Sequence, residues 1–157
     1  MFTENVAKVV SLHREGGINC AQAMLSVYGK YFGLQEDDAL KVSAALGGGM
    51  GGMGKICGSV TGAFLVFGLT YEIGNPESRG KVYELVKEFT ESFTAKHGSI
   101  SCSELLGHDI GTEEGRRAVR EQQLTKKICP ALDQTAAELV EELLAGRLEK
   151  RQCDEKG

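Results

Sequence analysis

Five cysteines are the most reactive side chains in this sequence of 157 residues. A deprotonated cysteine is both a nucleophile and a soft metal ligand. Four of them stand where helices are expected to begin: Cys20, Cys57, Cys102 and Cys129. At a helix N-terminus, unpaired N–H groups and the positive end of the macrodipole stabilise an anion. We therefore expect four thiols of lowered pKa, suited to nucleophilic attack or to metal binding.

The spacing of the cysteines excludes several common sites. No C-x-x-C or C-x-x-C-H segment occurs, so neither a thioredoxin-type pair, a zinc ribbon nor a covalent haem attachment is indicated. A shared site would have to be gathered from four separate helices. Each cysteine could instead be a small buried hydrophobic residue, but four at the same kind of position favour chemistry. Cys153 stands in the charged segment RLEKRQCDEKG with no cap beside it, and we interpret it as incidental.

A glycine-rich segment, LGGGMGGMGKICGSVTG, surrounds Cys57. It fits both the dinucleotide fingerprint G-x-G-x-x-G and part of a P-loop. Both nucleotide functions are disfavoured, because Ile56 stands where a P-loop needs Ser or Thr and no later strands complete a parallel sheet. Gly54, Gly58 and Gly62 recur at every fourth residue. On one helix face they would let a cofactor approach closely, so they are candidate cofactor-binding positions; tight helix packing explains them equally well.

Hydrophobic periodicity and capping residues place most of the chain in helices. Asn19 and Ser101 each begin a capping box. Pro130 is expected at the first position of the last helix, with Cys129 as its cap. We predict an all-α, single-domain bundle of about six to seven helices, with a glycine-rich loop before a buried central helix. The expected helices cover residues 3–15, 20–32, 36–46, 56–73, 76–97, 113–127 (or an irregular segment) and 130–151.

Composition describes an ordinary globular protein and excludes some functions. The net charge is −4 and the pI about 5.5, whereas a nucleic-acid binder needs a basic face. No apolar run is long enough to cross a bilayer, and the first residues lack a secretory signal. We therefore expect a cytoplasmic protein with no membrane insertion, where several cysteines suggest redox or metal chemistry. One helical domain is expected over residues 1–157, with an ordered core at about 3–147 and a charged tail at 148–157.

The three histidines are scattered along the sequence. A surface or capping role fits each of them better than a ligand role. They are His13, His97 and His108.

Four segments together resemble one protein family. GGINCAQAML, GGMGGMGKICGSVTGAFLVFGL, ISCSELL and KICPAL are similar to the C-GCAxxG-C-C family of redox-active proteins, over about residues 5–145. The resemblance implies a small bacterial or archaeal protein whose four defining cysteines are the four named first above. The family's Cys-Gly-Ala-x-x-Gly motif corresponds to residues 57–62, with Ser59 where alanine is usual. A second resemblance, to the cluster-binding part of split-Soret cytochromes, implies an iron–sulfur centre without their haem ligation.

The sequence leaves three uses open for Cys20, Cys57, Cys102 and Cys129, as catalytic thiols or as metal ligands. They could exchange electrons as dithiol/disulfide pairs with a redox partner protein, hold an iron–sulfur cluster, or hold zinc. Dithiol exchange is slightly favoured, because widely separated ligands are less typical of ferredoxin-like sites. A protein of another class would be a non-catalytic metal-binding or helical interaction module whose cysteines only pack. The sequence specifies neither the partner nor the substrate, and a homodimer is compatible with it.

Overall fold

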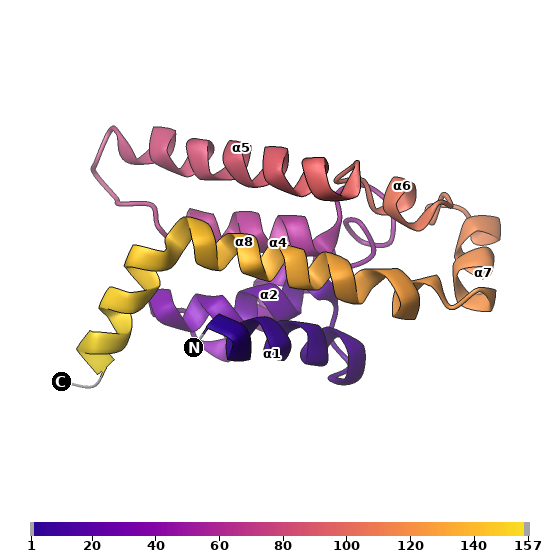
Figure 1. Cartoon of the computed structure of the whole chain (residues 1–157), viewed down its shortest axis with the longest axis horizontal. Coiled ribbons are helices and arrows are strands. Elements are labelled where there is room, and N and C mark those ends of the chain that lie inside the picture. Colours follow the sequence, from indigo (N-terminus) through magenta and orange to yellow (C-terminus); the bar gives the residue numbers. More distant parts are fainter. Residues whose placement is uncertain (1, 156–157) are drawn as a thin grey trace.

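The computed structural model describes the backbone of residues 2–155 and the side chains of residues 4–149. Over these residues the predicted all-α fold is confirmed, with eight α-helices, two 3₁₀ helices and no β-strand. No helix among them has the length and apolar character needed to cross a membrane. In Figure 1, α5 lies along one side of the molecule, and α6 and α7 form one end. The elements are α1 (Phe2–Glu15), α2 (Cys20–Gly29), η1 (Lys30–Phe32), α3 (Glu36–Ser43), η2 (Ala44–Leu46), α4 (Gly58–Gly68), α5 (Ser78–His97), α6 (Cys102–Leu106), α7 (Glu113–Glu121) and α8 (Leu124–Glu155).

The core forms around α4, the apolar helix that follows the glycine-rich segment. Most of its residues are buried, because α2, α5 and α8 pack around it. Gly62 of α4 lies so close to α2 that a Cβ there would be 2.7 Å from the Cβ of Met24. Toward α5, the rings of Phe67 and Phe89 meet edge to face with centroids 5.6 Å apart. The predicted buried central helix is therefore present, and Gly62 packs it against a helix of the same chain.

Local sequence signals explain several helix boundaries. Asn19 forms the predicted capping box, in which its side chain accepts the N–H of Gln22 and the Gln22 side chain accepts the N–H of Asn19. Ser101 accepts the N–H of Glu104, but the Glu104 carboxylate accepts a hydrogen bond from Ser99 instead of returning to the cap. Only half of the second box therefore forms. Each cap satisfies a backbone N–H that has no partner within its helix.

The last helix begins at Leu124, earlier than predicted, and Pro130 lies inside it. Cys129 is therefore an interior helical residue and not an N-cap, so the prediction for it was wrong. Proline removes only its own N–H from the helix and leaves one carbonyl without its usual partner. That loss is offset by burial, since Leu124 and Ile128 pack against a small apolar cluster that includes Leu106.

The other end of α8 continues beyond the expected ordered core. Leu148 is buried, with 2% of its surface exposed, and packs in the main core. The backbone remains helical through Glu155. The side chain of Cys153 lies outside the described residues.

The glycine-rich segment between η2 and α4 forms a left-handed turn. Residues 48–52, four glycines and Met50, all have φ between 61° and 77°, a region that residues with side chains rarely adopt. The N–H groups of residues 50 and 52–55 donate to carbonyls of residues 46–50. These groups are already paired within the segment, so they are not available to cradle a phosphate. The structure thus agrees with the rejection of a P-loop.

Candidate functional site

A short backbone pairing brings together the segments that carry Cys57 and Cys102. Ile56 and Ser101 form an isolated antiparallel bridge. On either side of it, the N–H groups of Cys57 and Cys102 donate to carbonyls of the opposite segment, at 2.8 and 2.6 Å respectively. Cys57 is the N-cap of α4, and Cys102 is the first residue of α6. The bridge therefore aligns the starts of two helices that are far apart in the sequence.

Glycines let the backbone approach two of the cysteines. A Cβ on Gly58 would overlap the sulfur of Cys20, which is the first residue of α2. A Cβ on Gly49, in the left-handed turn, would lie 2.6 Å from the Cβ of Cys102. Because neither glycine carries a side chain, α4 can start against Cys20 and the turn can lie over Cys102.

The helix α8 supplies the fourth cysteine and a buried carboxyl group that the sequence analysis missed. Cys129 and Asp133 are four residues apart, about one helical turn. One oxygen of Asp133 accepts a hydrogen bond from Ser59, and the other lies 2.5 Å from Nδ1 of His13. Ser59 follows Cys57 by two residues, so this carboxyl group connects α8 to the start of α4. The spacing of Cys129 and Asp133 was the one local signal that could have found it.

One cavity of about 250 Å³ is lined by Cys20, Cys57, Cys102 and Cys129. They come from α2, α6, α8 and the cap of α4, and each is a free thiol. Apolar side chains form much of the remaining wall. Three basic side chains also line it: His13, Arg116 and Arg120.

His13 therefore differs from the surface or capping role predicted for it. Its side chain is 15% exposed, lines the cavity and contacts Asp133. No local pattern indicates this contact, because α1 and α8 are distant along the chain. The two arginines were not singled out either; Arg116 is held by a hydrogen bond of 3.0 Å to the carbonyl of Ile110.

The three candidate cofactor-binding glycines occupy different environments. Gly58 lines the cavity. Gly62 packs against α2, as described above. Gly54 has a φ of 71° and belongs to the loop, where it lies against Ser103 and Ile110. Because α4 begins only at Gly58, Gly54 is not on the helix face that the four-residue spacing predicted.

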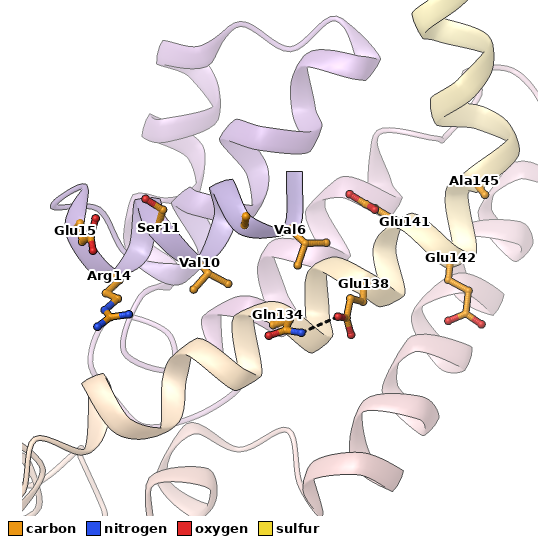
Figure 2. A pocket seen from close by; sticks show the side chains of 11 residues that line it. Val6, Val10, Ser11, Arg14, Glu15, Gln134, Glu138, Glu141, Glu142 and Ala145 are labelled. Atoms are coloured by element: carbon orange, nitrogen blue, oxygen red, sulfur yellow. Dashed lines mark hydrogen bonds between the residues drawn. The ribbon is translucent and has the colours of Figure 1, made fainter. Parts of the chain in front are cut away.

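A larger groove between α1 and α8 contains no cysteine (Figure 2). Its volume is about 680 Å³, and Val6 and Val10 of α1 face Glu138 and Glu142 of α8 across it. The carboxylates are exposed. The groove contains no thiol and no histidine, so the candidate redox or metal chemistry lies in the smaller cavity.

The pKa values of the four thiols are determined mainly by burial and not by their positions at helix termini. Burial raises the pKa of all four, that of Cys102 to about 12. Repulsion from neighbouring cysteines adds to the rise at Cys20, Cys102 and Cys129. At Cys57, hydrogen bonds from Ser59 oppose the effect of burial on the pKa. The prediction of lowered pKa values was wrong, because a buried thiolate loses more hydration than the backbone dipoles replace.

We predict that the metal-free protein reacts slowly with iodoacetamide at neutral pH. The reagent attacks the thiolate, and a rise in pKa from 9.0 to about 12 at Cys102 lowers the thiolate fraction at pH 8 about a thousandfold. The rate should then increase about tenfold per pH unit while the protein stays folded. Mass spectrometry of the alkylated peptides, with urea-unfolded protein as the control, measures this. Equal rates at pH 8 in the folded and unfolded chains would contradict the prediction.

Fold and site together define a class: a small all-helical protein with four free thiols around one cavity. Residues 18–143 match the family model described as "Putative redox-active protein (C_GCAxxG_C_C)". The match spans most of the sequence, so the chain belongs to this family, and the resemblance seen in its sequence is confirmed. No match was found among curated proteins or among solved structures.

Proposed function

We propose that this protein is a one-electron redox protein that binds an iron–sulfur cluster through Cys20, Cys57, Cys102 and Cys129. The observation that carries the proposal is that four separate segments each contribute a thiol to one cavity. Membership of a redox-active family supports the redox part of the proposal. Four cysteine thiolates are also the usual ligand set of an iron–sulfur cluster.

The arrangement of donors fits a polynuclear group better than a single ion. Within the described part of the chain, no three His, Cys, Asp or Glu side chains are close enough together to hold one metal ion. A zinc site needs its sulfur ligands about 2.3 Å from a common centre. The sulfurs here border a cavity of about 250 Å³ instead, which is room for a ligand of several metal and sulfide atoms.

Burial of the thiols favours metal binding over dithiol exchange. Exchange with a partner needs a sulfur that the partner's disulfide can reach. Cys20 and Cys57 are only 9% and 5% exposed, so an incoming protein has little access to them. A metal ion, in contrast, can be buried with its ligands and replaces the proton of each thiol.

A purely structural role for the cysteines explains less of the site. Cys102 and Cys129 pack against the apolar cluster that includes Leu106, but they are only partly buried and also line the cavity. Arg116 and Arg120 line the same wall. Both arginines are exposed, and their positive charges would offset the negative charge of bound thiolates.

A bound cluster would supply one-electron transfer. The chain itself would exclude water from two of the ligands and direct the backbone N–H groups of Ser59 and Val60 to the Cys57 sulfur. One electron would come from a reduced flavin- or iron–sulfur-containing carrier protein and pass later to an oxidised one. No covalent bond of the chain is made or broken in this exchange.

The test is anaerobic reconstitution of the full chain with ferrous iron and sulfide. We expect brown protein with about two to four iron atoms per chain and matching sulfide, and an electron paramagnetic resonance signal that responds to dithionite. Metal analysis of the protein as purified should be run in parallel with thiol titration.

Three other results would overturn the proposal. Colourless protein with thiol pairs that oxidise reversibly would establish dithiol exchange. One tightly held zinc per chain would establish a structural metal site. Four inert thiols without metal would establish that the cysteines only pack.

A further inference from the structure

Asp133 is a buried carboxyl group beside the cysteine cavity. Only 1% of its surface is exposed, and a buried carboxylate requires partners for both oxygens. Ser59 donates to Oδ1, and Nδ1 of His13 lies 2.5 Å from Oδ2. Both partners can donate a hydrogen, which suits the ionised form of the acid.

The hydrogen-bond network of Asp133 reaches two of the segments that carry cysteines. Ser59 is two residues after Cys57, in the first turn of α4. Cys129 precedes Asp133 by one turn of α8. His13 lines the same cavity as the cysteines. The carboxyl group is also close enough to raise the pKa of Cys20, Cys57 and Cys129 by charge repulsion, in addition to burial.

We propose that Asp133 is a positioning and charge-setting residue of the cysteine cavity, and that it lowers the reduction potential of the group bound there. This inference rests on the proposed iron–sulfur cluster. An electron added beside a fixed negative charge is disfavoured, and the effect is large where water is excluded. Arg116 and Arg120 in the wall act in the opposite direction, so the potential reflects the balance between them and the carboxylate.

Ser59 sets the position of this charge in the present chain. Its hydroxyl holds one oxygen of Asp133 at the first turn of α4, two residues after Cys57, and the alanine expected from the motif at this place has no such donor. Ser59→Ala therefore removes a positioning contact and keeps the charge.

The test compares midpoint potentials of the reconstituted full chain with those of Asp133→Asn, in a dithionite titration with viologen mediators. Each viologen radical donates one electron to the bound cluster. Asparagine has nearly the same shape as aspartate and can keep both hydrogen bonds if His13 changes tautomer. We expect the reduction equilibrium to shift at least about tenfold toward the reduced form, equivalent to a potential about 59 mV more positive.

Glu138→Gln is the matched control. It removes an exposed carboxylate from the same helix, outside the cysteine cavity, and should change the equilibrium less than about threefold because solvent screens it. Ser59→Ala keeps the charge of Asp133, so it should shift the equilibrium less than Asp133→Asn does. If Asp133→Asn does not fold, Ser59→Ala combined with Asp133→Val replaces the polar pair by apolar groups of similar volume and should shift the potential in the same direction.

The two proposals can fail separately. Wild-type protein that takes up no cluster overturns the proposed function and, with it, the role of Asp133. Variants that hold the wild-type amount of iron at an unchanged potential overturn only the role of Asp133.

Discussion

Cys57→Ser is expected to give a folded protein that retains almost no iron or sulfide after reconstitution. Loss of a residue that merely orients a metal ligand typically weakens binding about 10- to 100-fold, so loss of a ligand should cost more than about 100-fold. Serine keeps the small size of the side chain but is a poor ligand for iron at neutral pH. Iron and sulfide per chain, measured after removal of free metal, report the result.

Cys153→Ser is the matched control for this experiment. Its sequence context is a charged segment with no helix cap, and it lies outside the family's four-cysteine pattern. The Cys153→Ser protein should bind iron as the wild type does. Substitution of Cys20, Cys102 or Cys129 by serine should instead abolish iron and sulfide binding, as Cys57→Ser does. A Cys57→Ser protein with full iron and sulfide content would exclude Cys57 as a ligand.

Gly58→Ala is expected to destabilise the metal-free protein by roughly 1–3 kcal/mol, the usual range for an overpacked site. In a helix, alanine is normally more favourable than glycine by about 1 kcal/mol. Here the added methyl group would overlap the sulfur of Cys20 and lie 3.3 Å from the carbonyl oxygen of Leu46. The sulfur must move, because backbone surrounds the site on the other side. Urea denaturation monitored by circular dichroism measures the stability, and iron uptake should fall as Cys20 is displaced.

The control for this substitution is Gly68→Ala, in the same helix. A Cβ at Gly68 meets no atom within 4 Å, so the free energy of unfolding should change by less than about 1 kcal/mol and iron uptake should be unchanged. If Gly58→Ala behaved like Gly68→Ala, the close approach of α4 to Cys20 would not matter for the site.

Most of the helices could be predicted because their signals are local. The Asn19 box starts α2, and Gly98, with a φ of 85°, ends α5 as expected for a glycine after a helix. The start of α8 was predicted wrongly from Pro130, because it depends on contacts with distant parts of the chain. The burial of Leu124 and Ile128 depends on apolar residues of α6 and α7, and no local pattern reveals those partners.

The candidate site could be predicted only as a set of cysteines. Their number and positions are visible in the sequence, but what surrounds them is not. Asp133 contacts Ser59, which is 74 residues away in the sequence, and His13, which is 120 residues away. Contacts between residues so far apart produce no periodic pattern in the sequence. The direction of the pKa shifts was wrong for the same reason, since the extent of burial is decided by helices packed from elsewhere in the chain.

The spread of the cysteines from α2 to α8 has a consequence for biosynthesis. The cavity cannot exist until the ribosome has released Cys129, so loading of any group there must follow translation of every segment from α2 to the first part of α8. Once bound, the group would link four segments that are far apart in the sequence. Closing such long loops lowers the conformational entropy of the unfolded chain and so stabilises the folded protein. Newly made protein that fails to be loaded would therefore be the form most exposed to cellular proteases.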